Sequence, residues 1–546
     1  MSLTPELRQG IDKIRNYLFG GGYPDPLGNA EQLSYLFFFY LIEGIDADNE
    51  LKARATKKPY ESLFAGDWKL RNPLNAPSAA KAKVPAAQMR WSIWARGLTG
   101  EALVRWLRDE VFPFYTKVAE RSAMNFMEGA RLGIDEPTVL TQVIELVDGL
   151  HLDQSDADTK GDLFEYVLKQ IKTAGELGQF RTPRHIIRAI VEIVDPHIGE
   201  TIYDPAAGTA GFLVAAYNHI RLAHSSANAL EQVELDGKTV TRGWGEKLSS
   251  AMANRLANAT FYGNDVDPKM VRLATMNLTL RGLPNVRILK RNVLTTTMDR
   301  SERAALELPL NGYDVVLANP PFSGKVDKDR IVEDVKVGGT TATEILFLRY
   351  MLNSLKKDGR CGVVVPEGVL FGSTGAHKEL RRQLIENNTV EAVMSLPGGV
   401  FQPYSTVKTS VLFFKKGGRT EEVMFLHADN DGYKLDAQHD TAVDADDLPV
   451  LVDSYRHRTK HSKKWKKRTI DTEWSEKWWF ATSDEVRRND FNLSATLYRP
   501  QSKNQAVYRH PRELLDELRV IEVAIMEEVD GLYTSLSDLE DDHVTS

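Results

Sequence analysis

Short runs rich in β-branched residues alternate with helical stretches from about residue 155 onward, and no other feature of this sequence constrains its fold as strongly. Strands that alternate with helices build a mostly parallel sheet with helices on both faces. The last two runs are joined by a short connection rich in Gly and Pro, which predicts an antiparallel hairpin at one edge. The chain is therefore predicted to be an α/β protein. The predicted strands are residues 201–204, 260–265, 286–289, 313–318, 361–366, 390–396 and 409–414.

Residues 1–152 are predicted to form a separate helical domain. Leucine and isoleucine recur at three- and four-residue spacing from position 7 to position 18, which is the period of an amphipathic helix. The apolar run 33–42 is half as long as the roughly 20 residues of a membrane span, so it predicts a core helix. The stretch 57–87, rich in Pro, Ala and Lys, predicts an exposed connection. No signal peptide is predicted, and the chain is expected to be cytoplasmic.

The predicted sheet domain covers residues 153–480, and a C-terminal extension covers residues 481–546. Five apolar residues of the extension follow one another at spacings of four, three, four and four. A single apolar stripe of this kind predicts an amphipathic helix that needs another surface to bury it. The stripe consists of Leu514, Leu518, Ile521, Ile525 and Val529.

The overall charge argues against a general nucleic-acid binder. The formal net charge is −7, so any DNA contact must come from a local basic patch or from a partner. The basic stretch 456–468 around Trp465 is one candidate for holding DNA phosphates, and a solvated charged face is the alternative. The single cysteine, Cys361, excludes an intramolecular disulfide and a multi-cysteine zinc site. Its apolar neighbours predict a buried strand residue.

The strongest chemical signal is the tetrapeptide Asn319-Pro320-Pro321-Phe322, which follows the predicted strand 313–318 directly. Ligand sites of doubly wound sheets lie beyond the carboxyl ends of strands, and two prolines make a rigid turn. The exocyclic amine of a nucleobase is a poor nucleophile, because its lone pair is delocalised into the ring. The Asn319 side-chain oxygen and the Pro320 carbonyl can accept its N–H groups, and Phe322 offers a stacking face worth ~1–3 kcal/mol. The tetrapeptide therefore predicts a catalytic turn for transfer to an amine, with a plain strand-to-loop turn as the alternative.

A second motif follows the predicted strand 201–204. Its small residues let the backbone approach a ligand closely, and the helix that follows accommodates a carboxylate. No Gly-Lys-Ser/Thr follows, which excludes a phosphate loop. The predicted ligand contacts are Asp204, Ala207, Gly208, Thr209, Gly211 and Phe212.

Two further polar residues follow neighbouring predicted strands. Asp265 suits the ribose hydroxyls of a nucleoside cofactor, while Asp267 is the runner-up or a helix cap. Asn292 is placed to meet the adenine edge of such a cofactor, or is a turn residue. Upstream, Thr182-Pro183 either begins a helix for structural reasons alone or belongs to the site.

Taken together, the order 178–183, 204–212, Asp265, 319–322 resembles the amino-methyltransferases that modify DNA, in the gamma arrangement where the cofactor motifs come first. More closely, the chain resembles the modification (M) subunit of Type I restriction-modification systems. This similarity extends over most of the chain. The additional matching stretches are residues 7–46, 344–371, 396–401, 408–414 and 490–498.

The resemblance implies a Rossmann-like methyltransferase that uses S-adenosyl-L-methionine to methylate N6 of a flipped-out adenine, without a metal. The chain departs from the family in having Ala210 where Gly is common, Asp265 for Glu and Asn292 for Asp. Phe180 or Arg181 also stands where Tyr is common. Asp265 has a shorter side chain than the usual Glu, and Asn292 lacks the charge of the usual Asp. Both changes are expected to affect cofactor affinity. Besides the second motif and Asp265, the implied cofactor contacts are Gly178, Gln179, Phe180, Arg181, Thr182 and Pro183.

In this family a separate specificity subunit reads the DNA sequence, usually with two M subunits bound, and a motor-nuclease subunit can join. The resemblance therefore implies double-stranded DNA and a specificity subunit as partners. The apolar stripe 514–529 is the predicted docking helix for that subunit. The segment 323–343 is predicted to be either a lid or an ordinary loop. Three alternatives stay open: methylation of RNA or of protein glutamine, methylation of cytosine N4, and a catalytically silent assembly module.

Overall fold

The computed structural model describes the chain in two units, residues 1–466 with 477–498 and residues 467–476 with 499–546. The described residues are 4–57, 59–76, 82–121, 127, 129–152, 157–172, 182–283, 285–402, 405–436, 439–469, 473–500, 515, 518–519, 521–523, 525–526 and 528–530.

The N-terminal part of the first unit is helical, as predicted, and its core is aromatic. Phe39 stacks on Tyr115 with ring centroids 4.4 Å apart and meets Phe112 edge-on. The run 33–42 is buried throughout, which confirms the prediction of a core helix. No helix among the described residues has the length and apolar character of a membrane span. The helices are α1 (Pro5–Gly20), α2 (Pro26–Thr56), α3 (Trp91–Gly97), α4 (Gly100–Trp106), α5 (Phe112–Arg121), α6 (Pro137–Asp148) and α7 (Ala157–Lys172).

The prediction of an exposed connection at residues 57–87 is confirmed for most of the described positions, but the stretch is not a plain loop. The described part of this stretch contains a small hairpin, β1 (Asp67–Lys69) and β2 (Lys83–Pro85), and it buries Phe64 and Trp68. The buried carboxylate of Glu110 accepts a hydrogen bond of 2.8 Å from Trp68 Nε1. A few aromatic residues thus anchor a stretch whose composition is otherwise that of a loop.

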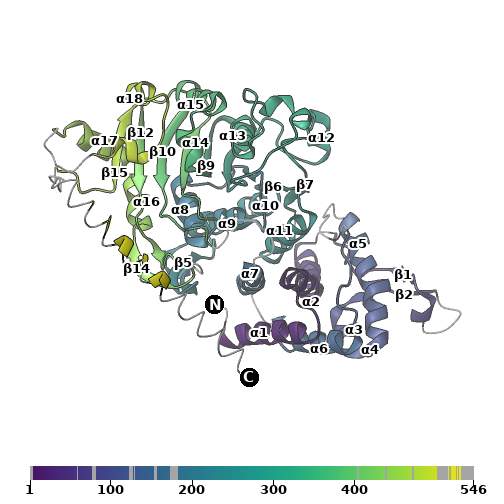
Figure 1. Ribbon diagram of the computed structural model, residues 1–546. Coiled ribbons are helices and arrows are strands. Elements are labelled where there is room, and N and C mark those ends of the chain that lie inside the picture. Colours follow the sequence, from purple (N-terminus) through teal and green to yellow (C-terminus); the bar gives the residue numbers. More distant parts are fainter. Residues whose placement is uncertain are drawn as a thin grey trace. The chain divides into compact units, whose positions relative to one another are not determined.

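A nine-stranded sheet lies at the centre of the first unit, in the order β15-β12-β10-β11-β9-β8-β3-β6-β7 (Figure 1). All seven predicted strands are present. Strands β7, β6, β3, β8 and β9 are parallel neighbours, as the alternation with helices predicts. The strands are β3 (Ile202–Asp204), β6 (Phe261–Asp265), β7 (Arg287–Lys290), β8 (Tyr313–Ala318), β9 (Leu355–Pro366), β10 (Thr389–Ser395), β11 (Thr409–Lys415), β12 (Glu422–His427) and β15 (Trp478–Thr482).

The antiparallel pairing of β10 with β11 is confirmed, but this hairpin does not lie at the edge of the sheet. Strand β11 inserts next to β9, β12 pairs parallel to β10, and β15 forms the edge. Strands β12 and β15 were not predicted, because each is a short apolar run set among charged residues. Cys361 is buried in β9, as predicted.

Helices pack around the sheet, and α11 also joins it to the N-terminal helices. Met270, Leu273 and Met276 of α11 share one apolar core with α2 and α7. The larger helices of this part are α8 (Arg184–Val194), α9 (Gly211–Ala223), α10 (Ser250–Asn258), α11 (Pro268–Leu280), α13 (Thr343–Ser354), α15 (Gly375–Asn387), α16 (Leu448–Arg456) and α17 (Arg458–Lys466). The shorter ones are α12 (Arg300–Ala305), α14 (Glu367–Phe371) and α18 (Ser483–Arg488).

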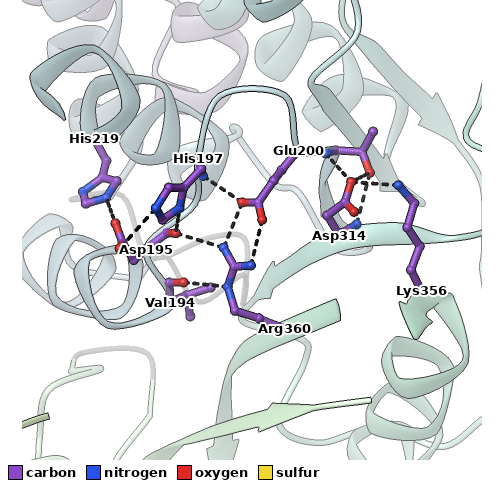
Figure 2. Close-up of polar contacts among 9 residues, drawn as sticks. Val194, Asp195, His197, Glu200, His219, Asp314, Lys356 and Arg360 are labelled. Atoms are coloured by element: carbon purple, nitrogen blue, oxygen red, sulfur yellow. Dashed lines mark hydrogen bonds and ion pairs between the residues drawn. The ribbon is translucent and has the colours of Figure 1, made fainter. Parts of the chain in front are cut away.

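A polar network holds the amino ends of the central strands in register (Figure 2). Asp314 Oδ2 accepts the backbone N–H and the hydroxyl of Thr201, each at 2.8 Å. Arg360 of β9 donates to the Glu200 carboxylate and to the carbonyl of Asp195 at the end of α8. The turn from α8 into β3 is therefore fixed, and with it the motif at the other end of β3.

Two small hairpins contact each other beside α8. β4 (Leu230–Leu235) and β5 (Lys238–Gly243) are joined at Asp236 and Gly237, which both have positive φ, as a tight hairpin turn requires. β13 (Asp431–Tyr433) pairs with β14 (Ala442–Asp446). Lys238 forms an ion pair with Asp446, and Tyr433 donates its hydroxyl to the Asp236 carbonyl at 3.0 Å.

The second unit carries the C-terminal stripe. The described positions from 515 to 530 are helical. Leu518, Ile521, Ile525 and Val529 are 39–57% exposed, and Leu514 lies outside the described residues. The described side chains of the stripe are thus apolar and exposed.

Candidate cofactor and catalytic site

The two predicted motifs meet at one cavity of about 250 Å³ at the carboxyl ends of the parallel strands. Strands β3 and β8 are neighbours, so the loops that leave them lie at the same edge of the sheet. The cavity extends from these loops between α8, α9 and the β4–β5 hairpin. The predicted residues that line it are Thr182, Asp204, Ala207, Gly208, Thr209, Gly211, Phe212 and Asn319. Pro183 caps α8, and Gly178, Gln179, Phe180 and Arg181 lie outside the described residues.

The loop after β3 presents its backbone to the cavity. Gly208 has φ +51°, and the space that a Cβ would occupy there is empty. Asn277 of α11 donates to the Thr209 carbonyl at 2.9 Å, and the Ala207 N–H donates to the Asn264 carbonyl at 2.9 Å. The loop is therefore held from behind and open toward a ligand.

Asp204 is a buried carboxyl in the wall of this cavity. It is 1% exposed, and its Oδ1 accepts the backbone N–H of Ala206 at 3.0 Å. Burial raises the pKa of Asp204 to about 8, and the charge of nearby Asp265 acts in the same direction. Near neutral pH the group is mainly the neutral acid, so it responds strongly to any positive charge placed in the cavity.

Asp265 supports the same loop from β6. Its Oδ2 accepts the Gly208 N–H at 3.0 Å, its Oδ1 accepts the Asp267 N–H at 2.9 Å, and burial raises its pKa. Asp267 caps α11 by accepting the N–H of Lys269, which is the structural alternative for that residue. Asn292 Oδ1 accepts the Leu294 N–H within its own turn. Asp265 and Asn292 do not line the cavity, and their cofactor contacts stay predictions.

Asn319 is held by one side of its amide and free on the other. Its Nδ2 donates to Thr182 Oγ1 at 2.8 Å. Its Oδ1 is buried and makes no hydrogen bond to the residues that the structure describes. An unmet buried acceptor costs about 1–3 kcal/mol, so this oxygen is suited to a donor from a ligand. The geometry is that of an acceptor fixed in advance of binding.

The rest of the catalytic turn is firmly packed. Pro320 is buried and Pro321 is exposed. Phe322 is 6% exposed and meets the ring of Phe401 edge-on, with centroids 5.1 Å apart and planes at 87°. No role was predicted for Phe401, although it lies in the matching stretch 396–401. It fixes the orientation of the Phe322 ring.

The segment after the turn, residues 323–343, is tied down at both ends. The backbone of Lys325 forms an isolated antiparallel β-bridge with that of Ala342. The side chains of Ile331, Val335 and Val337 are buried. The apolar anchors favour an ordered loop in the free protein. A lid movement on DNA stays a prediction.

The residues of the far wall of the cavity were not predicted from the sequence. Val233, Leu235 and Val240 of the β4–β5 hairpin line it, and so does Arg188 of α8. The Asp-Gly pair at 236–237, flanked by alternating apolar residues, was a readable hairpin signal. Arg188, by contrast, is brought there only by the packing of α8.

Buried ion pairs join α7 to the cavity wall. Arg221 of α9 donates to both oxygens of Asp158 at 2.8 and 3.0 Å. Arg242 of β5 pairs with Asp162 at 2.8 Å. Burial raises the pKa of Asp158, but the hydrogen bonds and charge of Arg221 outweigh it and hold the pKa below the ordinary value. Helix α7 is thus fixed by charge pairing rather than by apolar packing alone.

Comparison with known proteins agrees with the site. Residues 155–506 match the family described as N-6 DNA methylase. The chain is 29% identical over 453 residues to the Type I restriction enzyme EcoEI methylase subunit of Escherichia coli, covering 80% of this chain and 79% of that protein.

Two solved structures share the fold. A chain from a study of complex assembly and conformational transition of the type I R-M system matches with a TM-score of 0.63 and 25% identity, over 98% of each chain. The type I restriction-modification system methyltransferase subunit from Streptococcus thermophilus matches with a TM-score of 0.60 and 21% identity, over 90% of this chain and 98% of that one. Because the family match covers well over half of the sequence, this chain belongs to the N-6 DNA methylase family, the adenine-specific DNA methyltransferases.

Proposed function

We propose that this chain is the modification subunit of a Type I restriction-modification complex and methylates N6 of an adenine in DNA with S-adenosyl-L-methionine. The observation that carries the proposal is the buried, unmet Oδ1 of Asn319 in the wall of a cavity lined by the Asp204–Phe212 loop. An acceptor beside a nucleoside-sized cavity is what transfer to an exocyclic amine requires.

The residues present fit the cofactor. S-adenosyl-L-methionine supplies, when bound, an electrophilic methyl group on a positively charged sulfur. The space over Gly208 admits a ligand close to the backbone, and the buried carboxyl of Asp204 suits a cationic group. We assign the ribose to Asp265 and the remaining cofactor contacts to Ala207, Thr209 and residues 178–183.

At the catalytic turn, the chain binds and orients the base. The target adenine leaves the duplex at a cost of a few kcal/mol and stacks on Phe322. Its amine donates to Asn319 Oδ1 and to the Pro320 carbonyl. These two acceptors favour the pyramidal amine, whose lone pair is available for attack, so catalysis comes mainly from positioning. After transfer the amine nitrogen carries a positive charge and is strongly acidic, so it loses its extra proton to water, and no strong general base is needed.

Cofactor binding is expected to release a proton near pH 7. The pKa of Asp204 is about 8 in the free protein, so the carboxyl is mainly protonated at pH 7. The positive charges of the cofactor favour the ionised form and lower this pKa, which releases up to about one proton per chain. Above pH 8 the release fades, because Asp204 is already ionised before binding. Calorimetric titration with S-adenosyl-L-methionine in buffers of different ionisation enthalpy measures it.

The matched variant for this experiment is Asp204→Asn, which keeps the size of the side chain but cannot ionise. Its binding enthalpy should be the same in every buffer. Equal enthalpies for the wild-type protein in all buffers at pH 7 would show that Asp204 does not titrate on binding.

The C-terminal stripe is proposed to dock the specificity subunit. Its described residues are apolar and exposed, and burying such a face against a partner helix is the expected source of affinity. Deleting residues 510–546 should abolish assembly with the specificity subunit in size-exclusion chromatography. Deleting residues 537–546, which leaves the stripe whole, should not. A complex that survives the longer deletion contradicts the docking role.

Modified-base sequencing tests the proposed function directly. DNA from cells that express this chain with its specificity subunit should carry N6-methyladenine at one split motif, and DNA from Asn319→Ala cells should carry none. Detection of N4-methylcytosine at the motif would show that the substrate base is cytosine and not adenine. An assembled complex that leaves all DNA unmodified would favour the silent assembly module.

A further inference from the structure

Three potential metal ligands meet outside the cofactor cavity, between α8 and the β13–β14 hairpin. His185 Nε2 and His439 Nε2 each lie 2.9 Å from Asp431 Oδ2. The nitrogen and oxygen ligand atoms of the three residues all lie within 4.8 Å of one another. His185 and Asp431 are 246 positions apart in the sequence, so only the fold brings them together.

The cluster is enclosed, unlike acidic groups on a surface. Asp431 is fully buried, His439 is 3% exposed and His185 is 8% exposed. Tyr433 stacks on the His185 ring at 4.3 Å and fixes its plane. The ligand atoms are therefore held in place rather than meeting by side-chain mobility.

Hydrogen bonding to the described residues does not satisfy the ring nitrogens of His439. Both of its ring nitrogens are buried, and neither makes a hydrogen bond within the described part of the chain. Nε2 lies close to the carboxylate but outside hydrogen-bond geometry. Nδ1 therefore has no partner among the described residues, and Nε2 meets only the Asp431 carboxylate, as an ion pair. A buried imidazole satisfied so poorly is costly, and a cation shared with Asp431 and His185 would satisfy it.

The donor set selects the class of ion. Two imidazole nitrogens and one carboxylate oxygen suit Zn²⁺, whereas Mg²⁺ and Ca²⁺ prefer oxygen ligands. Ligands of a tetrahedral Zn²⁺ with bonds of about 2.0–2.1 Å lie roughly 3.3 Å apart. Each nitrogen needs to move only a few tenths of an ångström from its present 2.9 Å contact with Asp431. Three protein ligands leave the fourth position for water.

We propose that His185, Asp431 and His439 form a Zn²⁺ site that fastens the β13–β14 hairpin to the first turn of α8. The site goes beyond methyl transfer, because none of its ligands lines the cofactor cavity. It nevertheless supports the cavity from outside. Thr182 and Arg184, which line the cavity, lie within three positions of His185 in the chain, and Thr182 is hydrogen-bonded to Asn319. The β13–β14 hairpin in turn holds the β4–β5 hairpin through the hydrogen bond of Tyr433.

Metal content of the full chain tests the proposal. The protein is purified with a cleavable tag that contains no histidine, in buffers without chelator, and analysed by plasma mass spectrometry. About one equivalent of Zn²⁺ per chain is expected. After removal of the metal, Co²⁺ should restore one equivalent and give visible d–d absorption, while Mg²⁺ and Ca²⁺ should not bind at the site.

The variants His439→Gln and His185→Gln should lose the bound metal and the rise in Tm that Zn²⁺ gives to the metal-free wild-type protein. His197→Ala is the matched control. His197 belongs to another His–Asp–His group, around Asp195, whose side chain is 57% exposed. The metal content of the His197→Ala variant should therefore stay at the wild-type level.

Two results would overturn the proposal. One is wild-type protein that retains no Zn²⁺ and shows no Co²⁺ spectrum. The other is a folded His439→Gln variant that keeps one equivalent of metal. The first result is measured on the wild-type protein alone. The proposal can therefore be contradicted even if neither variant folds.

Discussion

Asn319→Ala should lower the rate of methyl transfer by roughly 10²–10³-fold or more, because it removes a preorganised hydrogen-bond partner of the reacting amine. The side chain is already in place in the free protein. Its Nδ2 is bonded to Thr182, and its Oδ1 is buried and unmet among the described residues. The contact with Thr182 fixes the orientation of the amide before substrate binds, so the loss of the acceptor should fall on the chemical step. Single-turnover transfer from labelled S-adenosyl-L-methionine to DNA, by the complete complex, measures it.

Cofactor affinity is the control that separates a catalytic role from a structural one. The Asp204–Phe212 loop is held by Asn277 and Asn264 rather than by Asn319, so the Kd for S-adenosyl-L-methionine should change only a few-fold. Loss of both transfer and cofactor binding would show that Asn319 supports the fold of the site.

Thr182→Val provides a graded comparison. It keeps the shape of the side chain and removes only the hydroxyl that holds Asn319 Nδ2. A net hydrogen bond is worth about 0.5–1.5 kcal/mol, so the transfer rate should fall by up to roughly tenfold. A loss as large as that of Asn319→Ala would mean that Thr182 contacts the substrate itself.

The sequence was sufficient to place the centre of the site, because strand order in a parallel sheet brings certain loops together. Asp204 and Asp265 each end a predicted strand and Asn319 directly follows one, and β6, β3 and β8 are neighbours in the sheet. Any pattern of strands alternating with helices puts such residues at one edge. The departure from glycine to Ala210 has a local cost. This residue has φ +67°, a conformation that glycine adopts most easily, and alanine accepts it here at some cost.

The remainder of the site depends on contacts between distant segments, which carry no local pattern. Arg221 and Asp158 look like ordinary surface charges in the sequence, yet both are buried. The same holds for His185 and Asp431, which lie on different elements far apart in the chain. Strand β15 was missed because five residues that pair at a sheet edge are too few for periodicity to identify.

Asp158→Ala should destabilise the protein by about 3–5 kcal/mol, which is the typical cost of leaving one charge of a buried pair unpaired. The Asp158 and Arg221 side chains are 4% and 8% exposed and share two hydrogen bonds. The carboxylate oxygens and the guanidinium have both been withdrawn from water, so removal of Asp158 strands Arg221 inside the protein. Urea unfolding followed by tryptophan fluorescence measures the change.

The stabilisation that Asp158 gives the folded protein depends on pH in a defined direction. The folded-state pKa of Asp158 is below its ordinary value of 3.8, so the stabilisation is complete well above pH 3.8 and is lost as pH falls through the folded pKa. The difference between wild-type and Asp158→Ala protein should therefore be constant near neutral pH. A difference that grew between pH 6 and pH 8 would point to another group.

A double variant distinguishes an unpaired charge from lost packing. Asp158→Ala with Arg221→Leu removes both charges and leaves an apolar side chain, so it should recover much of the stability that Asp158→Ala alone loses. The exposed pair of Glu333 with Lys336 is the control, since the Glu333 side chain is 84% exposed and Glu333→Ala should cost less than about 0.5 kcal/mol. If the double variant were as unstable as the sum of the single ones, the pair would stabilise α7 through packing. Charge compensation would then not explain how this helix is held against the cofactor cavity.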